Sequence, residues 1–125
     1  EASLKLKEIS YLHSEAYAAG ELKHGTISLV ENGTPVIAVI TDSKLADKTM
    51  MNLAEVKARG AAAYVFSSVD GVKSDAKLPH VSDKDDIFDV FPMLTYLQLL
   101  AYHTSLTRGC DVDQPRNLAK SVTVE

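Results

Sequence analysis

Two short apolar runs, residues 35–40 and 61–66, constrain the fold of this chain more than any other feature. The first reads Pro-Val-Ile-Ala-Val-Ile and the second Ala-Ala-Ala-Tyr-Val-Phe, and neither contains a charged residue. Continuous apolar runs of this kind are typical of strands buried on both faces of a parallel sheet. The segment between them, residues 44–59, predicts a helix whose inner face carries Leu45, Leu53 and Val56. A strand, a helix and a second strand predict parallel pairing through a right-handed crossover, so the fold class is α/β.

Residues suited to helix ends flank this central helix. Asp42 or Ser43 precedes it, and either side chain can cap the first N–H groups of the helix. Gly60 follows it, in the position where glycine usually ends a helix. These signals predict a helix with defined ends between the two strands.

Two further helices are predicted toward the ends of the chain. Residues 2–19 and residues 85–107 both repeat apolar side chains at helical spacing. Pro92 falls inside the second pattern and predicts a break or a fresh start there. Residues 78–81 predict a short strand at best. Helices on both faces of the sheet would give a three-layer sandwich.

The predicted sheet, with two or three strands, is thin for such a sandwich. The chain begins Glu1-Ala2-Ser3, without an initiator Met, and opens directly into the first predicted helix. We therefore expect strands before Glu1 to be missing, which would leave the domain incomplete at its N-terminus.

Composition excludes several classes of function. The 13 basic and 17 acidic residues give a net charge of −4, and no basic stripe indicates a nucleic-acid surface. No apolar run approaches the ~20 residues needed to span a bilayer, and the N-terminus does not resemble a secretory signal. Cys110 is the only cysteine, so it forms no internal disulfide. These features favour a cytoplasmic protein with a reduced thiol.

Lys5 and Glu8 are the first candidates for chemistry. They lie three residues apart and therefore share a face of the predicted helix. A carboxylate general base beside a lysine fits this pattern. Lys7 and Glu15 lie nearby, however, and a solvated charged face explains the same residues.

His24 lies in an irregular segment, Lys23-His24-Gly25, where a histidine can turn toward a ligand. An ordinary surface histidine explains it equally from the pattern alone. The other histidines lie in helix or strand patterns, and no pair has the spacing of a zinc site. The sequence therefore predicts no metal.

The turns after the two strands are the usual place for a phosphate in an α/β fold. They carry Thr41-Asp42-Ser43 and Ser67-Ser68. Neither turn is rich in glycine, and the carboxylate of Asp42 would repel an anion. Helix capping explains the first turn better than phosphate binding does.

The tail, residues 111–125, is polar at its start but ends Leu-Ala-Lys-Ser-Val-Thr-Val-Glu. Terminal extensions usually fray, whereas these apolar positions indicate a tail that docks. Lys120 would then lie among apolar neighbours, which lower the pKa of a lysine. Such a lysine could bind a sugar carbonyl or form a Schiff base.

Four segments of the chain resemble the glucosamine-6-phosphate synthase family, also called glutamine–fructose-6-phosphate aminotransferases (isomerizing). They read Leu-Lys-Leu-Lys-Glu-Ile-Ser at residues 4–10, Ala-Ala-Gly-Glu-Leu-Lys-His-Gly at 18–25, Leu-Gln-Leu-Leu-Ala-Tyr-His at 97–103, and the tail at 111–125. The first segment is shared in part by other sugar isomerase (SIS) domains, and the tail is more specific. The resemblance implies a flavodoxin-like or Rossmann-like SIS fold, with residues 1–110 in the second SIS half and 111–125 as a catalytic tail.

The resemblance also implies roles for the candidate residues. The position of Glu8 is the base that moves a proton between C1 and C2 of fructose 6-phosphate, and Lys5 matches a residue near the sugar. The position of His24 assists ring opening from the neighbouring subunit of a homodimer. Lys120 engages the sugar carbonyl as a Schiff base. Leu118 and Ala119 line and gate the path of ammonia.

One residue departs from the family pattern. Thr26 stands where the family usually has Pro after the His-Gly pair. The loop that carries His24 is therefore expected to be less rigid, without removing the role of His24.

The resemblance further implies a glutaminase domain and a first SIS half, neither of which is in this chain. The phosphate of the sugar is held by a loop of that first half, which counts against the two turns above. No cofactor is implied. We expect the 125 residues alone to be inactive. The alternatives are a stand-alone SIS isomerase or deaminase, and a regulatory SIS module that binds a sugar phosphate without catalysis.

Overall fold

The structure, a computed structural model, describes residues 1–81 and 86–118 of the chain. It divides into two compact units. One contains residues 1–16 together with the residues from Leu94 onward, and the other contains Tyr17–Met93.

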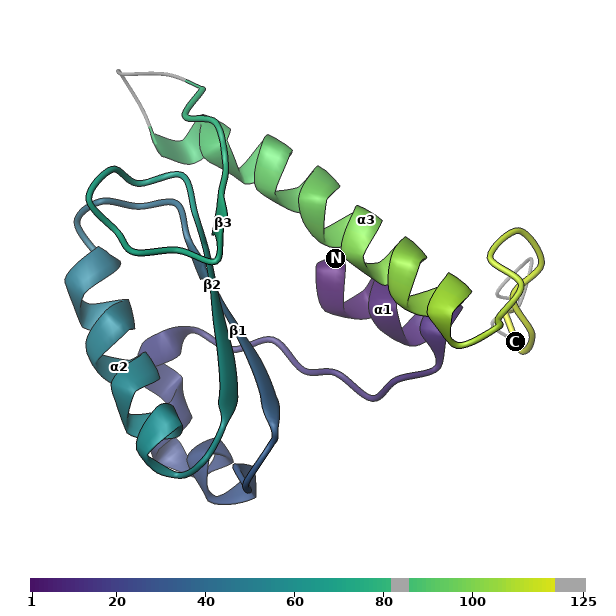
Figure 1. The fold of residues 1–125 in the computed structure, drawn as a ribbon, viewed down its shortest axis with the longest axis horizontal. Helices are drawn as coiled ribbons and strands as arrows, with labels where there is room; N and C mark the ends of the chain where they lie inside the picture. Colours follow the sequence, from purple (N-terminus) through teal and green to yellow (C-terminus); the bar gives the residue numbers. More distant parts are fainter. Residues whose placement is uncertain (82–85, 119–125) are drawn as a thin grey trace, which may run out of the picture. The chain divides into compact units, whose positions relative to one another are not determined.

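The second unit contains a parallel sheet of three strands in the order β1-β2-β3 (Figure 1). These are β1 (Pro35–Ile40), β2 (Ala62–Ser67) and the short β3 (Ala76–Lys77). Helix α2 (Ala46–Ala58) connects β1 to β2. The two apolar runs therefore form neighbouring parallel strands, as the sequence predicts, and the α/β class is confirmed. The short strand lies at 76–77 and not at the predicted 78–81.

The core of this unit lies between α2 and one face of the sheet. Its buried members come from β1, α2 and β2: Ala38, Ile40, Ala46, Leu53, Val56 and Val65. Along the second half of β1, burial alternates, because successive side chains point to opposite faces, whereas the last three residues of β2 are all buried. Ile37 and Val39 are 38 % and 42 % exposed, so the prediction that β1 is buried on both faces is wrong for this structure.

The start of α2 differs from its prediction. Leu45 occupies the N-cap position, without a side-chain hydrogen bond to the helix, and it is half exposed and not part of the inner face. Asp42 acts earlier, since its Oδ1 accepts the backbone N–H of Lys44 at 2.8 Å. The carboxylate therefore stabilises the turn that leads into α2 and does not cap the helix itself.

Gly60 ends α2 as predicted, because its φ of 93° is a backbone conformation that favours glycine. A Cβ on Gly60 would also meet the backbone of Asn32 at 3.0 Å. The N–H of Gly33 donates to the carbonyl of Gly60 at 2.8 Å, which holds the two turns together.

The first predicted helix is much shorter than residues 2–19. Helix α1 spans Ala2–Ser10 and ends at Tyr11, whose φ is 58°. The chain then folds back on α1, since the hydroxyls of Ser3 and Ser14 each donate to the other residue's carbonyl at 2.9 Å. In the second unit follow two 3-10 helices, η1 (Ala19–His24) and η2 (Thr26–Leu29).

The last predicted helix is divided. A 3-10 turn, η3 (Asp86–Asp89), precedes α3 (Val90–Thr107). Pro92 lies in the first turn of α3, where its missing N–H removes no helical hydrogen bond. The predicted fresh start is therefore confirmed, at Val90. The predicted boundary at residue 85 lies outside the described residues.

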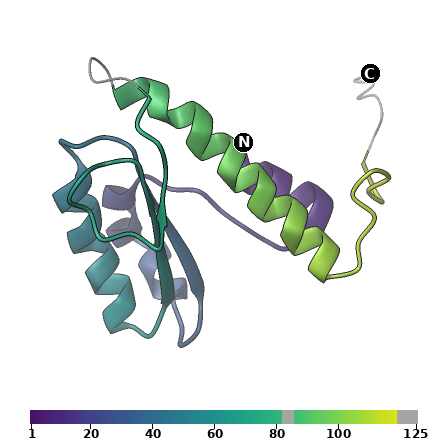
Figure 2. The same ribbon diagram turned by 45° about the horizontal axis from the view of Figure 1, so that its top comes forward.

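The first unit is built on α1 and the part of α3 from Leu94 onward, which lie side by side in both views (Figures 1 and 2). The hydroxyl of Ser105 donates to the carbonyl of Ile9 at 2.7 Å and joins the two helices. Ser10, Ala101 and Ser105 are fully buried. Small side chains at this contact allow the helices to approach closely.

Candidate active site

Helix α1 carries the Lys5 and Glu8 pair predicted from the sequence. The ammonium of Lys5 donates to a carboxylate oxygen of Glu8 at 2.6 Å, and Glu1 lies 3.9 Å from the same nitrogen. The Glu8 side chain is 24 % exposed, so it is accessible from solvent. The pair therefore forms on one face of the helix, as predicted.

The charges around Lys5 favour its protonated form. The hydrogen bond to Glu8, together with the negative charges of Glu8 and Glu1, raises the pKa of Lys5 above its ordinary value. A lysine held in this state is a poor nucleophile but a good partner for a carboxylate. Lys5 can thus orient Glu8, while Glu8 supplies the oxygen that a general base requires.

His24 is the last residue of η1, in the second unit. Its Nδ1 lies 2.9 Å from Oε2 of Glu21, one turn earlier, and the ring is 73 % exposed. Gly25 follows with φ of 142°, which turns the chain away directly after the histidine. A carboxylate at Nδ1 orients the imidazole, and such a ring can exchange protons with a ligand.

The tail is described up to Leu118, which is 46 % exposed. Asp111 starts it with a turn, because its Oδ1 accepts the N–H groups of Asp113 and Gln114. Arg116 then reaches Tyr11 at the end of α1. Ala119 and Lys120 lie outside the described residues. The described tail and the Lys5–Glu8 pair therefore belong to the same unit, whereas His24 belongs to the other.

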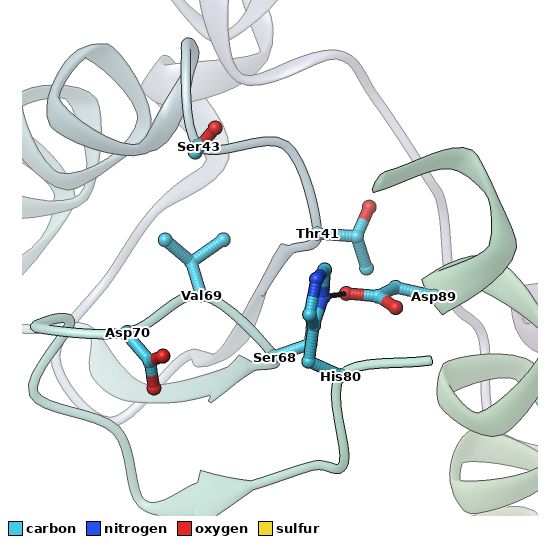
Figure 3. Close-up of a pocket in the computed structure, with 7 residues that line it drawn as sticks. All are labelled: Thr41, Ser43, Ser68, Val69, Asp70, His80 and Asp89. Carbon is cyan, nitrogen blue, oxygen red and sulfur yellow. Dashed lines mark hydrogen bonds and ion pairs between the residues drawn. The ribbon is translucent and has the colours of Figure 1, made fainter. Parts of the chain in front are cut away.

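A pocket of about 230 Å³ lies in the second unit, beyond the carboxyl ends of β1 and β2 (Figure 3). Its lining combines hydroxyl groups, an imidazole and two carboxylates, from Thr41, Ser43, Ser68, Val69, Asp70, His80 and Asp89. The two turns considered for phosphate thus border one pocket. Two carboxylates in its wall oppose the binding of an anion.

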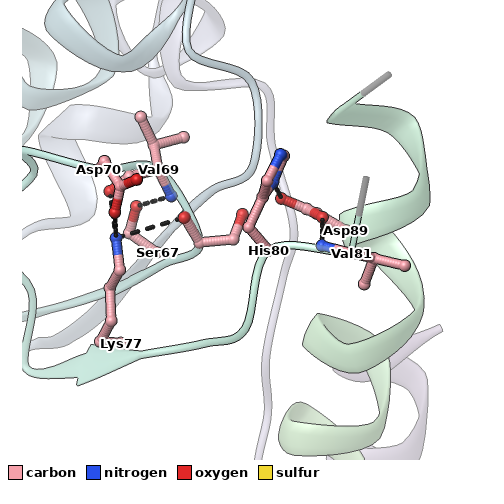
Figure 4. A network of polar contacts seen from close by, with 8 residues as sticks. Ser67, Val69, Asp70, Lys77, His80, Val81 and Asp89 are labelled. Carbon is pink, nitrogen blue, oxygen red and sulfur yellow. Dashed lines mark hydrogen bonds and ion pairs between the residues drawn. The ribbon is translucent and has the colours of Figure 1, made fainter. Parts of the chain in front are cut away.

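Asp89 is the buried charge of this pocket, with 1 % of its surface exposed. One carboxylate oxygen accepts the backbone N–H of Val81 at 2.8 Å, and the other lies 2.7 Å from Nδ1 of His80 (Figure 4). Burial raises the pKa of Asp89, but the Ser68 hydroxyl, His80 and the Val81 N–H together outweigh it and lower that pKa. The carboxylate therefore stays charged and holds residues 80–81 against η3.

Sequence reasoning missed the pairing of His80 with Asp89. The two residues are nine positions apart across a loop, and no periodic spacing connects them. The sequence offered one weak signal, an acidic residue just before an apolar helix. A second ion pair, Lys77 with Asp70 at 2.8 Å, closes the loop after β2, and it lowers the pKa of Asp70 (Figure 4).

In residues 1–81 and 86–118, no three His, Cys, Asp or Glu side chains gather as a metal site would require. No helix in the same ranges is both long and apolar enough to cross a membrane.

Comparison with known proteins assigns the family. The sequence profile of the SIS domain matches residues 1–85, which is more than half of the chain. The chain belongs to the SIS domain family. The parallel sheet of β1, β2 and β3 agrees with this assignment.

Curated relatives of this SIS domain cover its whole length. It is 54 % identical over 132 residues to the glutamine–fructose-6-phosphate aminotransferase (isomerizing) of Caldanaerobacter subterraneus subsp. tengcongensis. It is 51 % identical over 128 residues to the enzyme of the same name from Escherichia coli K12. In both cases 100 % of the chain is matched, and the chain spans 21 % of the relative's length.

Solved structures give the same picture. The C-terminal domain of glucosamine-fructose-6-phosphate aminotransferase from Francisella tularensis matches 91 % of the chain and 33 % of its own, with 42 % identity and a TM-score of 0.77. A glucosamine-6-phosphate deaminase from Thermotoga maritima matches 98 % and 35 %, with 26 % identity and a TM-score of 0.72. The fold of this SIS domain is therefore that of enzymes whose names refer to amino-sugar phosphates.

Proposed function

We propose that this SIS domain is the C-terminal part of the isomerase domain of a glucosamine-6-phosphate synthase. The complete enzyme would convert fructose 6-phosphate and glutamine into glucosamine 6-phosphate and glutamate. The observation that carries the proposal is the identity of 51–54 % to enzymes of this name over the entire chain, including the tail. The Lys5–Glu8 pair on α1 adds a chemical reason, since a carboxylate beside a fixed cation suits proton transfer on a sugar.

The reaction requires ring opening, carbonyl activation and a proton shift. His24 assists ring opening of fructose 6-phosphate by exchanging a proton with the ring and anomeric oxygens. The amine of Lys120 then adds to the C2 carbonyl, and water leaves as the Schiff base forms. Ammonia displaces the lysine from C2. Glu8 removes a proton from C1 and returns it to C2, and the proton of the C1 hydroxyl passes to the C2 nitrogen, which leaves an aldehyde at C1 and an amine at C2.

Parts beyond these residues complete the proposed enzyme. A glutaminase domain supplies ammonia, and a first SIS half holds the sugar phosphate. Leu118 and Ala119 line and gate the ammonia path, and Lys5 lies near the sugar. A homodimer in the cytoplasm supplies His24 from the neighbouring subunit. The division of the chain into residues 1–110 and a catalytic tail at 111–125 remains a prediction.

The direct test is an assay of the full-length protein that contains this sequence. With fructose 6-phosphate and glutamine, glucosamine 6-phosphate and glutamate should form in equal amounts. The isolated 125 residues should form none, because the proposed phosphate loop and ammonia source are elsewhere. Glucosamine 6-phosphate formation by the isolated chain would overturn the assignment as one part of a larger site.

The second candidate is a stand-alone SIS isomerase or deaminase. The likeness to the Thermotoga deaminase over 98 % of the chain favours it, although the identity of 26 % is about half that to the synthases. The same assay separates the two, since a deaminase releases ammonia from glucosamine 6-phosphate and does not hydrolyse glutamine. A regulatory SIS module would bind the sugar phosphate and show neither activity.

A further inference from the structure

We propose that Glu55 is a positioning residue for His24, which it holds in place through Lys23. The inference rests on the proposed function, because it concerns the ring-opening step assigned to His24. The ammonium nitrogen of Lys23 lies 2.6 Å from Oε1 of Glu55. Lys23 directly precedes His24 on η1, whereas Glu55 lies on α2. The ion pair therefore ties the segment that carries the histidine to a helix of the same unit.

The short segment η1 depends on contacts outside itself for its position. None of its six residues is buried, and its N-cap residue, Ala18, makes no side-chain hydrogen bond to it. It lies against α2 (Figures 1 and 2), and Leu22 packs against the hydrophobic core between α2 and the sheet. Leu22 and Lys23 are thus adjacent residues that contact different parts of the same unit.

The geometry of a 3-10 helix makes these two contacts decide where His24 points. With three residues per turn, successive side chains leave the helix axis about 120° apart. Packing of Leu22 alone holds η1 on the core but leaves the segment able to rock. The second contact, from Lys23 to Glu55, fixes the rotation of η1 about its own axis. The direction of the His24 side chain follows from these two points.

The contacts that His24 makes itself do not replace this anchor. Its partner Glu21 belongs to η1 and moves with it, so their contact orients the ring without placing the segment. The ring is largely exposed, which leaves little packing to hold it. Gly25 follows, and a Cβ there would meet no atom of another described residue within 4 Å. Because glycine gives the backbone freedom after the histidine, the anchor on the other side, at Lys23, controls its position.

The ion pair suits positioning better than it suits overall stability. The side chains of Lys23 and Glu55 are 51 % and 41 % exposed, and ion pairs at such sites contribute little to the free energy of unfolding. Opening of a short surface segment involves a much smaller free energy than global unfolding. A weak pair can therefore change how often η1 is seated on α2 without a measurable change in melting temperature.

Charge reversal tests the pair in the full-length protein. Glu55→Lys and Lys23→Glu each replace an attraction by a repulsion, and we expect each to lower kcat for conversion of fructose 6-phosphate to glucose 6-phosphate about 2–10-fold. The double variant, with both reversals, restores a pair of opposite charges and should recover to within about twofold of the wild type. KM for fructose 6-phosphate, glutamine hydrolysis and the melting temperature should be unchanged. Lys48→Glu, at an exposed lysine elsewhere on α2, is the matched control and should behave as the wild type.

Ring opening can be measured apart from the proton shift. The α and β anomers of glucose 6-phosphate interconvert only through the open chain, so exchange NMR reports catalysed ring opening in a Glu8→Gln background. We expect Glu55→Lys to slow this catalysed exchange and the double reversal to restore it. His24→Asn in the same background should leave only the spontaneous exchange. A residue that merely supported the fold would not act on this step while glutamine hydrolysis stayed constant.

The outcomes separate the inference from the function on which it rests. If the wild-type protein neither isomerises the sugar nor forms glucosamine 6-phosphate, the proposed function fails before any variant is compared. If the wild type is active and Glu55→Lys matches it in kcat and in anomer exchange, Glu55 does not position His24. A double reversal no more active than Glu55→Lys alone would also overturn the inference, because the effect would then not pass through Lys23.

Discussion

The ammonium nitrogen of Lys5 lies 2.6 Å from a carboxylate oxygen of Glu8, one turn along the same short helix. The charge that Glu8 places beside Lys5 keeps the lysine protonated, as its raised pKa indicates. A fixed cation in turn limits the rotamers of the carboxylate and keeps one of its oxygens engaged. In the proposed reaction the carboxylate of Glu8 would take the proton while Lys5 orients it.

Glu8→Gln should abolish the proton shift while keeping the shape of the side chain. A positioned general base contributes about 10²–10⁴-fold in rate, and we expect a loss of that size in kcat for sugar isomerisation. Glutamine hydrolysis should continue at the wild-type rate. Glu31→Gln, at an exposed glutamate before β1, is the control. Isomerisation by Glu8→Gln within a few-fold of the wild type would exclude Glu8 as the base.

Lys120→Ala should abolish interconversion of fructose 6-phosphate and glucose 6-phosphate, because no amine remains to form the Schiff base. The glutaminase reaction should survive in the same preparation, which shows that the protein is folded. Lys57→Ala removes an exposed lysine near the end of α2 and should change neither rate. Interconversion that persists in Lys120→Ala would mean that the carbonyl is activated by another group.

A mixture of two inactive variants tests whether His24 serves the neighbouring subunit. If Glu8 and His24 of one site come from different subunits, dimers of Glu8→Gln with His24→Asn contain one intact site. Random mixing should then restore roughly a quarter of the wild-type rate. If both residues come from the same subunit, every site of the mixture lacks one of them. A mixture as inactive as its components, with subunit exchange verified by native mass spectrometry, would exclude a shared site.

The strands and α2 could be predicted from the sequence because their signals are local. The apolar runs at residues 35–40 and 61–66 favour strands over other structures, and Gly60 supplies the backbone conformation that ends the helix. The burial of each face of β1 was harder to predict. Ile37 and Val39 are as apolar as Ile40, and it is the packing of α2, with Leu22, Ile27 and Val30, that makes one face buried and leaves the other exposed.

Long-range contacts explain why the first helix was predicted too long. Leu12 and Ala16 continue the helical spacing, so the pattern gives no reason to stop at Ser10. The helix ends because Tyr11 adopts a left-handed backbone conformation, and the chain then folds back so that the Ser3 hydroxyl donates a hydrogen bond to the carbonyl of Ser14. Neither event has a signature in local spacing.

The candidate site was predictable only in part for the same reason. Lys5 and Glu8 lie on one helix, so their spacing alone places them together, and the structure has them in contact. The contact of Tyr11 with Arg116 depends on the whole fold of the first unit, since 105 positions separate them. The pairing of His80 with Asp89 likewise depends on a loop whose path no propensity predicts.

Asp89→Asn should destabilise the protein in a way that depends on pH. The variant keeps an acceptor for Val81 but loses the charge that the His80 imidazole contacts, so we expect a loss of about 1–3 kcal/mol in the free energy of unfolding at pH 7. The pKa of Asp89 is lowered in the folded state, so its contribution is complete above the unfolded value of about 3.9. It is lost as the pH falls through the lower, folded pKa. Urea unfolding between pH 7 and pH 2.5 should therefore show the stabilities of Asp89→Asn and the wild type converging below about pH 4.

Asp113→Asn, at an exposed aspartate of the tail, should follow the wild type throughout. A difference between Asp89→Asn and the wild type that stays constant down to the lowest pH would show that the charge of Asp89 contributes nothing.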